Sequence, residues 1–217
     1  MYFKKKGWRL LWALYIFIYL PWFFTLEHFI TLDTPGIHIL NTQIDYAIPF
    51  CEYFIIPYIL WFFYVAGACI LMYFIADNAE FLKFAISLAG GMSICMIICM
   101  IYPNAITLRP EHIPDNIFGN IVAGLYSTDT STNVFPSIHV YNSLAVHIAL
   151  YKCKALKNHH VLLWSSFILA TLICLSTMFL KQHSIVDVIG AFILMAIMYV
   201  LLYVVKYKKH SSAKAEA

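Results

Sequence analysis

Long apolar runs separated by short polar connections dominate this sequence, and five of them are long enough to cross a lipid bilayer. A spanning α-helix needs about 20 mostly apolar residues, because the hydrocarbon core of a bilayer is about 30 Å thick. Hydrophobic residues make up 62% of the chain and charged residues only 12%, which lies outside the range of water-soluble proteins. We therefore predict an all-α, polytopic membrane protein in which residues 1–217 form a single membrane domain. The five runs are residues 10–26, 54–76, 84–102, 161–180 and 185–205.

A sixth apolar segment, residues 137–151, is shorter and more polar than the others. It carries His139, Asn142, Ser143 and His147. Polar residues within a span are costly in lipid, so they usually face the interior of a helix bundle or a water-filled cavity. We predict that this segment also crosses the membrane, which gives a six-transmembrane-helix bundle.

The lysines and arginines indicate the orientation of the six predicted spans. With the N-terminus inside, 12 of the 14 basic residues fall on the cytoplasmic side, as is typical of membrane proteins. Without residues 137–151 as a span, the last two helices and the lysine-rich end would lie on the wrong side. We predict a multi-pass protein of the cell membrane with both termini cytoplasmic and residues 206–217 a disordered tail. The cytoplasmic set is Lys4, Lys5, Lys6, Arg9, Lys83, Lys152, Lys154, Lys157, Lys206, Lys208, Lys209 and Lys214.

The six cysteines predict neither a disulfide framework nor a metal site. Four of them fall inside predicted spans, Cys153 is on the cytoplasmic side, and only Cys51 is near the outer face. Cys95 and Cys99 share a helix face, which would suit a metal pair, but packing between helices is the favoured interpretation. We predict no metal and no cofactor.

Three short motifs fall on the outer side of the predicted bundle. They are Leu-Arg-Pro at residues 108–110, Pro-Ser-Ile-His at residues 136–139 and His-Ser-Ile-Val-Asp at residues 183–187. By chance, this composition would produce His-x-x-x-Asp roughly 0.4 times and Pro-Ser-x-His roughly 0.02 times. The second pattern is therefore informative, and the shared face strengthens both.

The residue types in these motifs suit the chemistry of phosphoryl groups. His183 and Asp187 are expected one turn apart on the last helix, where the carboxylate holds one imidazole nitrogen and leaves the other free. Ser137 is expected to begin a helix whose N–H groups can bind an anion, with His139 in its first turn. Arg109 adds a planar cation suited to phosphate oxygens. Together these residues predict a phosphoryl-transfer site at the extracytoplasmic face, without a metal cage.

The order Arg-Pro, Pro-Ser-x-His and His-x-x-x-Asp on six predicted helices resembles the type 2 phosphatidic acid phosphatase superfamily. This superfamily includes lipid phosphatases and, on a related branch, inositol phosphorylceramide and sphingomyelin synthases. The resemblance covers about residues 45–190. The segment Asp-Tyr-Ala-Ile-Pro-Phe at residues 45–50 is also similar to an element before the second helix of bacterial members.

The resemblance implies a role for each matched residue. His183 would attack phosphorus and become a phosphohistidine, Asp187 would orient it, and His139 would protonate the leaving oxygen. Arg109 and Ser137 would hold the phosphate. The sequence departs from the family pattern at three places, where a lysine, a glycine and a Ser-Arg pair are expected. The residues found there are Tyr102, Ile138, and Ser176 with Thr177.

Lys181 lies two residues before His183 and leaves two interpretations open. Its flexible side chain could bring an ammonium to the same phosphate, partly replacing the missing arginine. It could instead be an anchor at the lipid headgroups.

The leading function is hydrolysis of a lipid phosphomonoester or diphosphate, with a lipid phosphate as substrate and membrane lipids as surroundings. A transferase that passes a phospho-headgroup to a lipid alcohol is the first alternative, and the transferase branch also tends to lack the basic residues missing here. A transporter or metal-binding channel would use His139, His147 and His183 along a pore, and a membrane scaffold would use none of them. No nucleic-acid partner is predicted, and the oligomeric state stays open.

Overall fold

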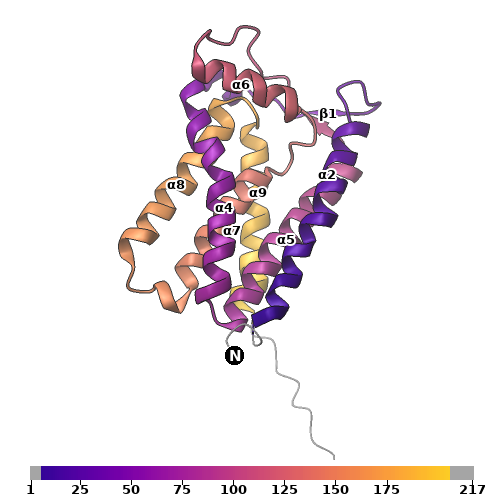
Figure 1. Ribbon diagram of the computed structural model, residues 1–217. Helices are drawn as coiled ribbons and strands as arrows, with labels where there is room; N and C mark the ends of the chain where they lie inside the picture. The colour runs from indigo at the N-terminus through magenta and orange to yellow at the C-terminus, as the bar shows by residue number, and fades with distance from the viewer. Residues whose placement is uncertain (1–5, 206–217) are drawn as a thin grey trace, which may run out of the picture.

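The computed structural model describes residues 6–205, and most of its helices run side by side along one axis (Figure 1). Five helical segments in this part of the chain are long and apolar enough to cross a membrane, and each coincides with one predicted run. The protein is therefore a helical membrane protein. The predicted tail, residues 206–217, lies outside the described residues. The five segments are Gly7–Phe29, Glu52–Ile75, Asn78–Ile101, His160–Phe179 and Ile185–Val204.

Several of these segments combine more than one kind of helix. The first joins the 3₁₀-helix η1 (Gly7–Tyr15) to α2 (Ile16–Phe29). The second joins η2 (Glu52–Phe54) to α4 (Ile55–Ile75), while α5 (Asn78–Ile101) and α8 (His160–Phe179) are continuous. The last joins α9 (Ile185–Tyr199) to η4 (Val200–Val204), a short π-helical turn.

The predicted sixth span forms α7 (Ile138–Lys152), which packs against α4, α5, α8 and α9. Its 15 residues make it about 22 Å long, which is shorter than the bilayer core. Asn142 and Ser143, which lower the hydropathy of this segment, are buried between helices and do not face lipid. The approach to α5 is close, since a Cβ atom at Gly91 would lie 2.0 Å from the Tyr141 ring.

One end of the bundle is covered by the two long connections. In Figure 1, α6 (Ile117–Thr128) lies across this end, and α3 (Gln43–Ala47) belongs to the other connection. The all-α expectation needs a small correction, because β1 (His38–Ile39) and β2 (Asn104–Ala105) pair in parallel. The two connections run alongside each other here and satisfy each other's backbone groups, as buried backbone requires.

Capping interactions hold the opposite end together. The buried Arg9 guanidinium donates to the carbonyl oxygens of Tyr73 at 2.7 Å and Ala76 at 3.0 Å, where α4 ends. The 3₁₀-helix η3 (Lys154–Leu156) follows α7, and the Lys154 ammonium lies 2.8 Å from the Asp77 carboxylate, which caps α5. The chain after α7 is thus fixed to the start of α5.

Candidate active site

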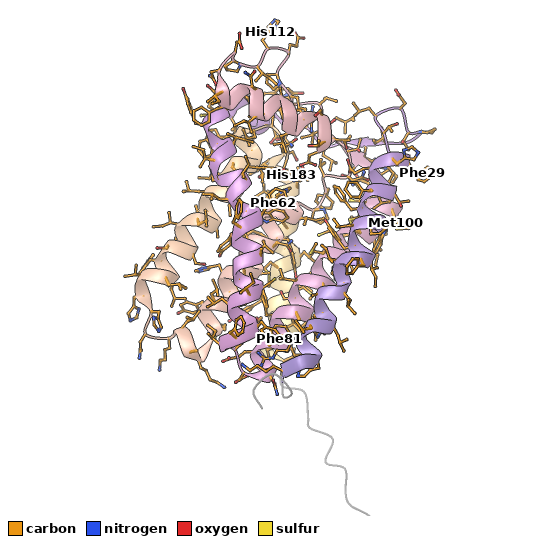
Figure 2. All side chains as sticks on the ribbon, viewed as in Figure 1. Phe29, Phe62, Phe81, Met100, His112 and His183 are labelled. Atoms are coloured by element: carbon orange, nitrogen blue, oxygen red, sulfur yellow. The ribbon has the colours of Figure 1, made fainter. Side chains whose placement is uncertain are left out.

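The turn between α8 and α9 carries His183 and presents it inside the bundle, below α6 (Figure 2). The backbone N–H groups of Gln182 and His183 both donate to the Thr177 carbonyl, at 2.9 and 3.0 Å. Ser184 is the N-cap of α9 and forms a capping box with Asp187. The prediction that His183 lies on the last helix is therefore wrong, because the cap places it just before the first turn.

His183 and Asp187 nevertheless meet as the sequence predicts. His183 Nδ1 lies 3.3 Å from Asp187 Oδ2, which also accepts a hydrogen bond from the Ser184 N–H at 2.8 Å. Asp187 is fully buried and His183 is 8% exposed. A carboxylate on Nδ1 favours the tautomer whose lone pair is on Nε2, so Nε2 is left free to act as a nucleophile. No described residue donates to the other oxygen, Asp187 Oδ1.

His139 lies in the first turn of α7 and faces His183, with 5.8 Å between the ring centroids. Two aromatic rings of α4 pack against His139, Tyr58 at 4.6 Å and Trp61 at 4.3 Å between centroids. The Trp61 indole N–H is buried and has no hydrogen-bond partner among the described residues. Both imidazoles are therefore close enough to contact a single phosphoryl group.

Ser137 is the N-cap of α7 and is completely buried. Its hydroxyl oxygen accepts from the Val140 N–H at 3.4 Å, and its own N–H donates to the Asp187 carbonyl at 3.2 Å. This second bond ties the start of α7 to the first turn of α9. Helix geometry leaves the Ile138 and His139 N–H groups without an intrahelical acceptor, which is the arrangement that binds anions.

The approach to Ser137 is held by Asn104 in β2. The Asn104 amide oxygen accepts from the N–H groups of Val134 at 2.9 Å and Phe135 at 2.8 Å. The Phe135 ring packs on Gly190 of α9, where a Cβ atom would lie 2.4 Å from it. A larger residue at position 190 would push this loop away from α9.

Arg109 is joined to the turn that carries His183. Its Nη2 donates to the Gln182 side-chain oxygen at 2.7 Å and to the Asp129 carbonyl at 2.5 Å, and its Nη1 donates to the Tyr126 carbonyl at 3.0 Å. Nε is buried and has no acceptor among the described residues, and one hydrogen of Nη1 is also left over. Burial lowers the pKa of the Arg109 guanidinium from its ordinary value, whereas the neighbouring Tyr126 and Asp129 raise it.

A polar network that the sequence did not reveal connects Arg109 to the rings around His139. Gln182, 2% exposed, also donates from Nε2 to the Asp129 carboxylate at 3.3 Å. The same carboxylate oxygen accepts from the Tyr58 hydroxyl at 2.6 Å. Isolated Gln, Asp and Tyr residues carry no recognisable spacing, so no sequence signal could have identified them.

Asp45 is a second residue that was not predicted as part of the site. Its Oδ1 accepts from the Ile185 N–H at 2.7 Å, and its Oδ2 accepts from the Thr42 N–H at 2.7 Å. The short helix α3 is thereby fastened to the start of α9, next to His183. A signal did exist here, because Asp45 begins the segment at residues 45–50 that resembles a family element.

Lys181 bonds to the connection that contains α3. Its ammonium donates to the carbonyl oxygens of Asp45 at 2.6 Å and Ile48 at 2.5 Å, and its backbone has a φ of +54°. Burial lowers the pKa of this ammonium, while Asp45 raises it. Lys181 is 7% exposed, so it is not an exposed headgroup anchor in this structure. Its role as a phosphate ligand stays a prediction.

The three departures from the family pattern add no cation to the described site. Tyr102 stacks on His38 at 4.1 Å, and the hydroxyls of Ser176 and Thr177 donate within α8 to the carbonyls of Ile173 and Cys174. His147 is an interhelical histidine, with Nδ1 3.1 Å from the Ser166 hydroxyl. All six cysteines are free thiols. Within residues 6–205, no group of three or more His, Cys, Asp or Glu side chains could hold a metal ion.

Comparison with known families gives one result. The profile described as the PAP2 superfamily matches residues 80–211, which contain every residue assigned to the site except those of α3 and α4. The searches of curated proteins and of solved structures find no match.

Proposed function

The chain belongs to the PAP2 superfamily, whose members are phosphatases and phosphotransferases acting on phosphate esters, and on this premise we propose a specific activity. The proposed activity is hydrolysis of a lipid phosphomonoester or diphosphate through a phosphohistidine on His183. The observation that carries the proposal is the His183 imidazole, held by buried Asp187 and facing His139 across 5.8 Å.

In the first step, His183 Nε2 attacks phosphorus while the bond from phosphorus to the leaving oxygen breaks. His139 donates its proton to that oxygen, so the lipid leaves as an alcohol, or as a monophosphate when the substrate is a diphosphate. The imidazolium that forms on His183 is stabilised by the Asp187 carboxylate. Arg109 and the N–H groups at the start of α7 bind the phosphoryl oxygens, where negative charge accumulates.

In the second step, water attacks phosphorus and the bond to His183 Nε2 breaks. His139, now neutral, accepts a proton from the water, and inorganic phosphate is released. The reaction returns both histidines to their starting states, as microscopic reversibility requires of an acid that becomes a base. We propose that no metal ion takes part.

We also propose that α7 is the sixth membrane span, with both termini cytoplasmic and the site at the extracytoplasmic face. The support is that Ser137, before α7, bonds to Asp187, whereas Lys154, after α7, bonds to Asp77 at the other end. The short helix thus extends between the two ends of the bundle. Lys83, Lys152 and Lys154 lie together at the end remote from His183, as the positive-inside rule favours.

The test is to trap the intermediate. Purified protein is incubated briefly with a ³²P-labelled lipid phosphate and denatured, and acid-labile, base-stable label should be found on His183. His183→Ala should carry no label and should show no turnover while keeping the melting temperature of the wild type. Turnover by His183→Ala would refute the proposal.

The same reaction distinguishes the two acceptors. With a lipid alcohol present, a hydrolase releases mainly inorganic phosphate, whereas a transferase forms a new phosphorylated lipid. Turnover should also persist in chelator, and vanadate should inhibit it as a mimic of the trigonal transition state.

A further inference from the structure

A pocket lies at the end of the bundle remote from His183. It has a volume of about 280 Å³ and opens between the start of α5, the end of α7, η3 and η4. Figure 2 shows Phe81, from the first turns of α5, at this end and His183 near the other. The pocket is therefore separate from the candidate active site. Its polar lining consists of Asp77, Glu80, Lys83, Lys152, Lys154 and Tyr203.

The two carboxylates of the pocket are already occupied. Asp77 and Glu80 form the capping box of α5, and Glu80 also accepts from the Lys154 N–H at 3.0 Å. The remaining Asp77 oxygen binds the Lys154 ammonium at 2.8 Å. Among residues 6–205, neither acid forms an ion pair with a second lysine.

Lys83 and Lys152 have no carboxylate within ion-pair distance among residues 6–205. Each ammonium lies instead over a tyrosine ring, Lys83 5.2 Å from the Tyr203 centroid and Lys152 5.3 Å from the Tyr199 centroid. The two rings stack on each other with 5.4 Å between centroids. This arrangement holds two cations at the pocket before any ligand arrives, so less side-chain entropy is lost on binding.

From this geometry we propose that the pocket binds a phosphate ester anion through Lys83 and Lys152. A phosphate has enough acceptor oxygens to take hydrogen bonds from both ammonium groups at once. The volume of the pocket corresponds to about nine waters in the liquid, which leaves room for a glycerol-sized substituent on the phosphate. Tyrosines and lysines at the end of spanning helices lie at the level of lipid headgroups, where anionic lipids attract basic side chains. The proposal does not depend on the activity of His183.

The experiment measures binding to the full chain in a neutral detergent by thermal shift and native mass spectrometry. The probes are short-chain phosphatidylglycerol, short-chain phosphatidylcholine, glycerol phosphate and inorganic phosphate. Phosphatidylglycerol should bind at least tenfold more tightly than phosphatidylcholine. Lys83→Gln and Lys152→Gln should each weaken that binding at least fivefold, whereas Lys157→Gln, which removes an exposed lysine outside the pocket, should not.

Two comparisons decide the source of the phosphate and the site that binds it. Tight binding of phosphatidylglycerol alone identifies a lipid headgroup, and equal binding of glycerol phosphate identifies a soluble ester. In an Arg109→Ala background the two lysine variants should still weaken binding at least fivefold, because Arg109 lies at the other end. Binding that responds to Arg109→Ala and not to the two lysine variants would overturn the proposal, as would equal binding of both lipids. Neither outcome would bear on the phosphohistidine at His183.

Discussion

Two buried or half-buried arginines at opposite ends of the bundle make nearly the same contacts. Arg9 binds carbonyl oxygens where α4 ends and lies 4.7 Å from the Phe81 ring centroid. Arg109 binds carbonyl oxygens where α6 ends and lies 4.2 Å from the Tyr126 ring centroid. In each, Nε is buried without a partner among the described residues.

The two arginines differ in the third group that each one binds. Arg9 donates to the Asn78 side chain at 2.9 Å, next to the cap of α5, and no histidine is part of that cluster. Arg109 donates to Gln182, the residue before His183. A buried guanidinium that caps a helix is therefore a structural element by default. It becomes part of a candidate site only through the candidate histidines that lie next to its network.

The largest difference in kcat between the two ends should come from replacing one aspartate by asparagine at each end. Asp187→Asn should lower kcat by on the order of 10³-fold to 10⁴-fold, because an amide no longer stabilises the imidazolium of His183. Asp77→Asn is the matched control, since asparagine also caps a helix and no histidine depends on Asp77. Steady-state kinetics on one lipid phosphate in matched micelles measures both. More than a tenth of wild-type kcat in Asp187→Asn would mean that the carboxylate does not orient the nucleophile.

Removing each arginine should separate catalysis from stability. Arg109→Ala should lower kcat/KM by on the order of a hundredfold, because charge-assisted donors to the phosphate are lost. Arg9→Ala should lower the free energy of unfolding by about 2 kcal/mol through the lost capping bonds, while the folded fraction keeps its kcat/KM. Denaturant melts in detergent and kinetics on both variants test this pair. Equal losses of kcat/KM would remove the distinction between the two ends.

Breaking the link between Arg109 and the His183 turn should lower kcat/KM less than removing Arg109 itself. Gln182→Met keeps the volume of the side chain and removes both its bonds, to Arg109 and to Asp129. We expect kcat/KM to fall by roughly tenfold, since the guanidinium and the carboxylate each lose one buried partner. Gln43→Met, at an exposed position of α3, provides the control. An unchanged kcat/KM would show that Gln182 does not position either group.

Substituting Asp45 should lower both kcat and the free energy of unfolding moderately. Asp45→Ala removes the acceptor for the Ile185 N–H and the carboxylate half of the α3 capping box, which should cost about 1 to 2 kcal/mol. Because Ile185 follows His183 closely, kcat should also fall severalfold. Asp45→Asn retains an acceptor oxygen and should restore most of the kcat. If the asparagine variant is as slow as the alanine variant, the charge of Asp45 matters and not its hydrogen bond.

The smallest effect is expected at Lys181, where two substitutions can be compared. Its φ of +54° lies in the left-handed region, which costs an ordinary side chain about 1 kcal/mol and costs glycine little. Lys181→Gly and Lys181→Ala both lose the bonds to Asp45 and Ile48, but glycine removes the backbone strain. Lys181→Gly should therefore melt at the higher temperature, with both variants keeping most of the wild-type kcat. A loss of kcat near a hundredfold in both variants would indicate that the Lys181 ammonium binds the phosphate.

The helices could be predicted because hydropathy is a local property of the chain. Runs such as residues 161–180 are apolar throughout, and the observed helix His160–Phe179 differs from that prediction by one residue at each end. The weak run at residues 137–151 required the charge asymmetry as a second argument. Its polar side chains are buried by four neighbouring helices, which hydropathy alone cannot anticipate.

The histidines and Asp187 could be predicted because their spacing within short motifs already limits their geometry. Residues four apart near a helix start meet whether the first lies on the helix or just before it. The sequence alone therefore determined the membrane class, the family resemblance and the His183–Asp187 pair. These depend on composition and on contacts within one turn.

The tertiary structure decided everything that depends on distant contacts. Lys181 bonds to carbonyls more than 130 residues earlier in the chain, Asp45 caps a helix 140 residues later, and Arg109 reaches Gln182 across 73 residues. The Lys83 and Lys152 pocket likewise joins the start of α5 to the end of α7, η3 and η4. A buried cation takes whichever acceptors the packed helices bring to it, because leaving it unpaired is costly. Which acceptors those are is settled only when the helices pack.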